Sequence, residues 1–122
     1  MLIVASLLLL ATEIHTPDSS DKPNIFPVII SYAAPPTFEV CKSIDPAKAD
    51  NYAIEMSHWL QRNGASVEKL KALLAAKVGE GGTSQLDQLR DDMHAAVEDF
   101  KRFPVETQKA GCGRMYSYVG SN

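Results

Sequence analysis

The sequence predicts an all-α fold, a small bundle of three to four helices closed by one disulfide and preceded by a signal segment and an extended arm. Three observations predict it. Apolar residues after residue 45 recur at spacings of three and four, the period of one helix face. No stretch alternates apolar and polar residues for long enough to indicate a sheet. Two cysteines follow an apolar N-terminal run, a combination typical of an exported, disulfide-closed protein.

The composition of the chain is that of one ordinary globular domain. It has 122 residues, of which 45% are hydrophobic and 22% are charged. Its formal net charge is −3, and its lysines and arginines form no block. A general nucleic-acid surface or an anionic-membrane surface is therefore not expected.

Residues 1–11 are nearly all apolar. This run is too short for a bilayer span of about 20 residues, but it suits the apolar region of a secretory signal. Because no Lys or Arg precedes it, a buried N-terminal helix or strand is the alternative interpretation. We expect the protein to be secreted or periplasmic, with no stable membrane span after processing.

The signal could be cleaved at either of two places. A second apolar run, 25–34, contains Ser31-Tyr32-Ala33, which places small residues where a signal peptidase recognises its substrate. Either the signal ends near 11–16 and 17–40 form an extended arm, or the whole of 1–33 is a leader. The cleavage point is thus predicted between about 11 and 33.

The folded domain is predicted to cover 38–119. Residues 33–37, Ala-Ala-Pro-Pro-Thr, are not expected to be regular helix because proline lacks a backbone donor and restricts the residue before it. Cys41 and Cys112 allow one pairing only, and export favours a disulfide over two free buried thiols. Closing so long a loop would stabilise a chain with a limited core.

Two helices are predicted in the first half of the domain. The first begins at Asp45-Pro46, with Asp as the N-cap and Pro in the first turn, and ends at Asn63-Gly64. The second begins at Ser66 and leads into a loose, glycine-rich link at 79–82. The short connection at 63–65 predicts that these two helices fold back on one another.

The third predicted helix, 83–103, is the most clearly amphipathic stretch of the chain. Thr83 is expected to accept from its first free N–H groups, and Pro104 stops it. Residues 105–110 are predicted to add a helical turn or two. Gly111-Cys112-Gly113 is then expected to break regular structure, and the remaining apolar residues to pack as a tail on the bundle.

One pattern is typical of a metal centre. Glu55-x-x-His58 and Asp91-x-x-His94 are carboxylate-x-x-His pairs on two predicted helices, as in four-helix di-iron proteins. At about 100° per residue, however, both histidines and Asp91 lie on the polar side of their helices. No metal and no cofactor are therefore expected. The glycines at 79–82 lack the strand and the lysine of a phosphate loop, and no serine has a nucleophile context.

Methionine and aromatic residues are the remaining candidates for a site. They form plain core in most helical domains, but they can also line a site for an apolar ligand. The residues that would line such a site are Tyr52, Met56, Trp59, Met93 and Phe100.

The run GASVEKLKA at 64–72 resembles the central turn of the nematode polyprotein lipid-binding allergens, and Cys112 followed by Met115-Tyr116 resembles their C-terminal end. Those allergens are small, secreted helical modules with two cysteines. The segment between Gly64 and Cys112 is longer here than in that module. The resemblance implies an apolar ligand bound between helices.

The sequence therefore predicts an exported helical binding protein without catalytic activity, with a protein partner and an inhibitor, immunity or accessory role. The alternative is a carrier of a fatty acid or another small apolar ligand in the helix core. An enzyme whose site gives no sequence signal, built from residues such as Glu55, His58 or Arg114, is the third hypothesis.

Overall fold

The computed structural model describes residues 24–122, and this part of the chain is a bundle of four α-helices closed by one disulfide. The only pairing of extended residues within it is a single antiparallel bridge, Val78 to Ser84. The predicted all-α fold is confirmed. The predicted signal at 1–11 lies outside the described residues. The elements in chain order are α2 (Phe26–Ile44), η2 (Pro46–Lys48), α3 (Ala49–Ala76), η3 (Glu80–Gly82), α4 (Gln85–Phe100) and α5 (Val105–Ser121).

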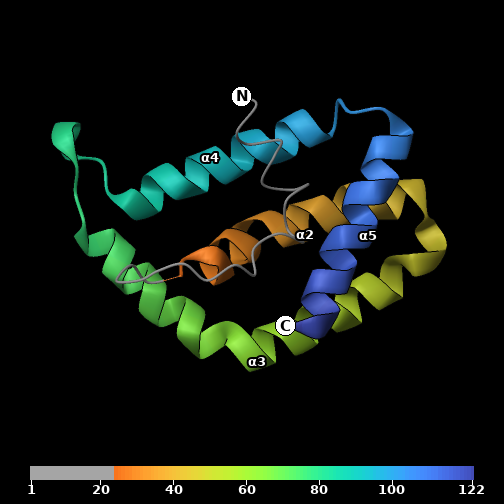
Figure 1. Ribbon diagram of the computed structural model, residues 1–122, viewed down its shortest axis with the longest axis horizontal. Coiled ribbons are helices and arrows are strands. Elements are labelled where there is room, and N and C mark those ends of the chain that lie inside the picture. Colours follow the sequence, from red (N-terminus) through yellow and green to blue (C-terminus); the bar gives the residue numbers. More distant parts are fainter. Residues whose placement is uncertain (1–23) are drawn as a thin grey trace.

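Helix α2 is the centre of the bundle. It lies between α3 and α4, and α5 crosses near its C-terminal half (Figure 1). Eight of its residues are buried, so it contributes a larger share of the core than its length suggests. They are Phe26, Val28, Ile30, Ala33, Ala34, Thr37, Phe38 and Cys41. The helical domain thus begins at Phe26 and not at Phe38.

The prediction that 33–37 cannot be helical is wrong, because α2 runs through Pro35 and Pro36. An interior proline costs about 3 kcal/mol, whereas burying one large apolar side chain contributes about 1.5–3 kcal/mol. Pro35 is exposed and Pro36 is half-buried, so neither proline takes a place in the buried core. Pro27 lies in the first turn, where no N–H is needed. Burial of one whole face of α2 therefore outweighs the preference of proline against the interior of a helix.

The predicted break at 63–65 is also wrong, because α3 is continuous. Gly64 is not in the left-handed conformation that ends a helix, which the structure assigns only to Gly81 and Gly82. Trp59, Val67 and Leu74 lie on the buried side of α3 on both sides of the predicted break, so one continuous helix buries all three. Asp45 makes no side-chain cap, and α3 begins four residues later.

Polar side chains of α3 hold the end of α5. Arg62 donates to the Val119 carbonyl at 2.8 Å, and Asn63 donates to the Asn122 carbonyl at 2.9 Å. Both accept because the last carbonyls of a helix have no partner within it.

Helix α5 runs through Gly111-Cys112-Gly113, so the predicted break there is wrong as well. A Cβ on Gly111 would lie 2.7 Å from Cε1 of Phe100, which means that only glycine lets α5 approach α4 this closely. Gln108 fastens the same contact, since its amide donates to the carbonyls of Phe100 and Lys101 at 3.1 and 3.2 Å. The apolar tail foreseen at the C-terminus is the second half of this helix.

Helix α4 is the predicted amphipathic helix, and its buried residues are Met93, Ala96, Val97 and Phe100. The N-cap of α4 is Ser84 and not the predicted Thr83. The Ser84 hydroxyl accepts a hydrogen bond from the Asp87 N–H at 3.0 Å. The link before it adopts the 3-10 turn η3.

The disulfide between Cys41 and Cys112 joins α2 to α5, as predicted, with 5.9 Å between the Cα atoms. Cys41 is fully buried and Cys112 is 6% exposed. Within 24–122 no helix is both long and apolar enough to cross a membrane.

Candidate functional site

A groove of about 700 Å³ lies between the C-terminal half of α2 and the first half of α3, and we call it the α2–α3 groove. Its floor is largely apolar: Phe38 stacks on Tyr52 with 4.9 Å between ring centroids and 12° between ring planes, and Met56 also lines it. The complete lining is Pro35, Phe38, Glu39, Lys42, Ala49, Asp50, Tyr52, Ala53, Met56, Ser57, Leu60 and Gln61.

The rim of the α2–α3 groove carries both signs of charge. Lys42 and Glu39 form an ion pair of 2.9 Å, and Asp50 adds one further carboxylate. Because the paired side chains are 41% and 70% exposed, the pair stabilises the fold very little and can separate when an occupant approaches. Leu60 is 46% exposed and presents an unpartnered apolar side chain at the groove.

The structure separates the five predicted lining residues into two groups. Tyr52 and Met56 line the α2–α3 groove. Trp59, Met93 and Phe100 do not line the α2–α3 groove and are at most 2% exposed, so they are packed core. Among residues 24–122 the indole N–H of Trp59 finds no acceptor.

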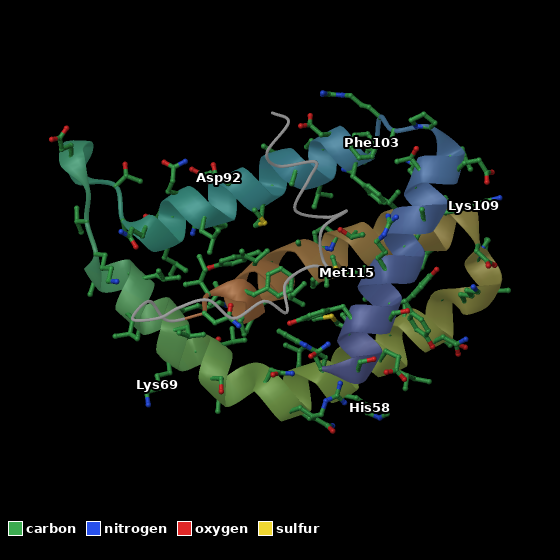
Figure 2. All side chains as sticks on the ribbon, viewed as in Figure 1. His58, Lys69, Asp92, Phe103, Lys109 and Met115 are labelled. Atoms are coloured by element: carbon green, nitrogen blue, oxygen red, sulfur yellow. A yellow bond between two sulfur atoms is a disulfide. The ribbon has the colours of Figure 1, made fainter. Side chains whose placement is uncertain are left out.

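The two carboxylate-x-x-His pairs do not converge. His58, Asp91 and His94 are exposed, and Glu55 is half-buried. Figure 2 shows His58 at one outer edge of the bundle and Asp92, beside the second pair, at the opposite edge. In the described part of the chain, no group of three or more His, Cys, Asp or Glu residues could hold a metal ion.

A second hollow, of about 410 Å³, lies over the disulfide, and we call it the disulfide hollow. It is assembled from the end of α2, the η2 turn, the start of α3 and the middle of α5. Its lining is Cys41, Ile44, Asp45, Lys48, Tyr52, Lys109, Cys112, Gly113 and Tyr116. The sequence carries no signal for this site, because the lining comes from segments about 60 residues apart that only the folded chain brings together.

Tyr52 stands between the two sites and contributes to both linings. Burial, then the Asp45 carboxylate and then Tyr116, raise the pKa of the Tyr52 hydroxyl above its usual value. The hydroxyl therefore remains a hydrogen-bond donor at neutral pH. Its ring also contacts the Tyr116 ring edge-on, with centroids 5.7 Å apart.

No family model matches this chain, and no curated protein or solved structure matches it either. The run 64–72, which resembles a turn of the nematode allergens, lies inside the continuous helix α3. The candidate sites therefore have to be judged on their own geometry.

Proposed function

We propose that this chain is an exported binding protein without catalytic activity that holds an α-helix of a partner protein in the α2–α3 groove. The observation that carries the proposal is the groove itself, an apolar floor of Phe38, Tyr52 and Met56 that is open along one side. Proteins commonly recognise an amphipathic helix by laying its apolar face into such a groove.

The α2–α3 groove is preorganised for this role. Its floor is made by side chains of two helices, and α2 is fastened to α5 by the disulfide. Little ordering is then needed on binding, which reduces the entropic cost of association. Covering the exposed half of Leu60 would by itself contribute about 1 kcal/mol, given about 1.5–3 kcal/mol for a whole leucine.

The openness of the groove favours a helix over a small apolar molecule. Sites for small molecules enclose most of the ligand surface, whereas an occupant here would keep one side in water. A fatty acid in the helix core would have to displace Trp59, Met93 and Phe100, which fill that space. Carriage of an apolar ligand is therefore the second hypothesis, and it is an outcome of the tests below.

Export is proposed on two grounds. The disulfide is typical of proteins that fold in an oxidising compartment. The predicted apolar signal precedes the described residues. An inhibitor, immunity or accessory role in the periplasm or outside the cell is consistent with both.

Site-specific cross-linking tests the proposal. A benzophenone amino acid replaces Leu60, in the groove, and in a matched control it replaces Ile54, which is on the same helix, 50% exposed and outside the groove. Each variant is irradiated in the native extracellular or periplasmic fraction. We expect a cross-link from position 60 that maps to an amphipathic helix of one protein, and none from position 54. Equal yields at both positions, or none at either, would refute helix binding.

A titration with an environment-sensitive fluorescent fatty acid distinguishes the second hypothesis. Helix binding predicts no saturable change in probe emission at micromolar protein. A saturable change accompanied by a shift in Trp59 emission would replace helix binding by carriage of an apolar ligand, because Trp59 reports on the sealed core.

A further inference from the structure

The disulfide hollow brings two lysines together on a negatively charged chain. Its lining includes Lys48, Lys109 and one acidic residue, Asp45. The formal net charge of the whole chain is −3. Glu106 lies outside the lining but 3.5 Å from Lys109, so an anionic ligand would compete with one carboxylate for each ammonium group.

Neither lysine is held tightly by the carboxylate nearest to it. Lys48 lies 4.0 Å from Asp45, and Lys109 lies 3.5 Å from Glu106. The two lysine side chains are 59% and 57% exposed. Ion pairs of this kind are weak and exchange readily with water, so both ammonium groups can turn toward a bound anion.

Two tyrosine hydroxyls add neutral donors to the hollow. Neither Tyr52 nor Tyr116 has a hydrogen-bond partner among the described residues. The side chain of Tyr52 is only 5% exposed, but its hydroxyl oxygen is not completely buried. Water or a ligand can therefore reach this hydroxyl group. Asp45, Tyr52 and Tyr116 all line the hollow, and the two tyrosine rings contact each other edge-on.

The rest of the hollow is apolar and has room for a ligand body. Ile44, the disulfide and the edge-on pair of tyrosine rings form its walls. Gly113 contributes no side chain, and a Cβ placed there would meet nothing within 4 Å. A volume of about 410 Å³ lies within the usual range for small-molecule sites.

We propose that the disulfide hollow binds a small organic carboxylate. The carboxylate group accepts hydrogen bonds from Lys48, Lys109 and the tyrosine hydroxyls, and an aromatic or branched apolar body packs against Ile44 and the disulfide. The hollow shares Tyr52 with the α2–α3 groove, but this proposal does not depend on helix binding there.

The test is a titration followed by ¹H–¹⁵N correlation NMR, with benzoate as the probe and benzamide as its uncharged counterpart of similar shape. We expect benzoate to cause saturable shifts confined to 41–48, Tyr52 and 109–116, and benzamide to cause none. Inorganic phosphate has no apolar body and should shift the same residues less. Equal shifts with benzamide, a stronger response to phosphate, or shifts spread over lysines elsewhere would each overturn the proposal.

Substitutions at one glycine provide a matched pair. Gly113→Leu places a side chain in the hollow and should abolish benzoate binding, whereas Gly113→Ala should keep the wild-type affinity. Both replace a helical glycine whose surroundings are open, so both should fold at least as well as the wild type, which thermal unfolding verifies. Benzoate binding that survives Gly113→Leu would refute the assignment.

Removing the charge of one lysine in the hollow is an independent test of benzoate binding. Lys109→Met should weaken benzoate binding by about tenfold, the loss expected for one hydrogen bond to a charged group. Lys77→Met, at the end of α3 and outside the lining, is the control and should leave the affinity unchanged. An equal effect of the two substitutions would show non-specific attraction and would overturn the proposal.

Discussion

Alanine substitutions at Gly111 and Gly113 should have different effects on stability, although both residues lie in the same turn of helix α5. A Cβ on Gly111 would lie 2.7 Å from Cε1 and 3.1 Å from Cζ of Phe100, well inside the 3.5–4.0 Å at which carbon atoms attract. Phe100 is fully buried, so its ring cannot move without disturbing the core. Overpacking of this kind costs about 1–3 kcal/mol.

Both substitutions also gain about 1 kcal/mol of helix propensity, because alanine replaces glycine within a helix. That gain is common to the pair and cancels in their difference. Gly113→Ala should therefore be stabilised by up to about 1 kcal/mol, and Gly111→Ala should be less stable than Gly113→Ala by about 1–3 kcal/mol.

Urea denaturation of the oxidised protein, followed by circular dichroism, measures this difference as a change in midpoint at constant slope. Thermal unfolding provides a second readout, with about 4–8 °C in Tm for each kcal/mol in a domain of this size. Equal midpoints for the two variants would refute the close approach of α5 to Phe100. They would also refute the argument that only glycine fits at position 111.

Four further outcomes are expected. Reduction of the Cys41–Cys112 disulfide, which closes a loop with a sequence separation of 71, should lower the free energy of unfolding by about 4 kcal/mol in urea titrations with and without reductant. Gln108→Leu removes both donors to the carbonyls at the end of α4 and should cost about 1–2 kcal/mol in the same assay. Burial raises the pKa of Tyr118, so the folded protein holds the hydroxyl proton up to a higher pH than the unfolded chain does. The free energy of unfolding should therefore fall as pH rises above 10.0, and this fall should be smaller in Tyr118→Phe. Intact mass of the protein isolated from its native source should place the mature N-terminus before Phe26, because cleavage after residue 33 would remove 8 of the 19 residues of α2, the helix at the centre of the core. A mature chain that starts at residue 34 would contradict this.

Much of the candidate site could not be predicted from the sequence. Of the five residues predicted to line an apolar site, Tyr52 and Met56 line the α2–α3 groove, while Trp59 is sealed in the core. A periodic pattern shows that a side chain faces inward, but it does not distinguish the floor of a groove from the middle of the core. The disulfide hollow gave no pattern at all, since it joins residues 41–52 to residues 109–116.

The sequence by itself determined the helical class, the amphipathic face of α4, the solvent exposure of His58 and His94, and the pairing of the two cysteines. Each of these follows from spacing along one helix or from simple counting, and needs no knowledge of neighbouring elements.

Only the tertiary structure decided where the helices begin and end. Local signals at 33–37, 63–65 and 111–113 all predicted breaks, and the chain is helical at all three. The physical reason is one of magnitude. A glycine or proline preference amounts to about 1–3 kcal/mol at one position, whereas each unbroken helix buries several large side chains in phase, at about 1.5–3 kcal/mol apiece.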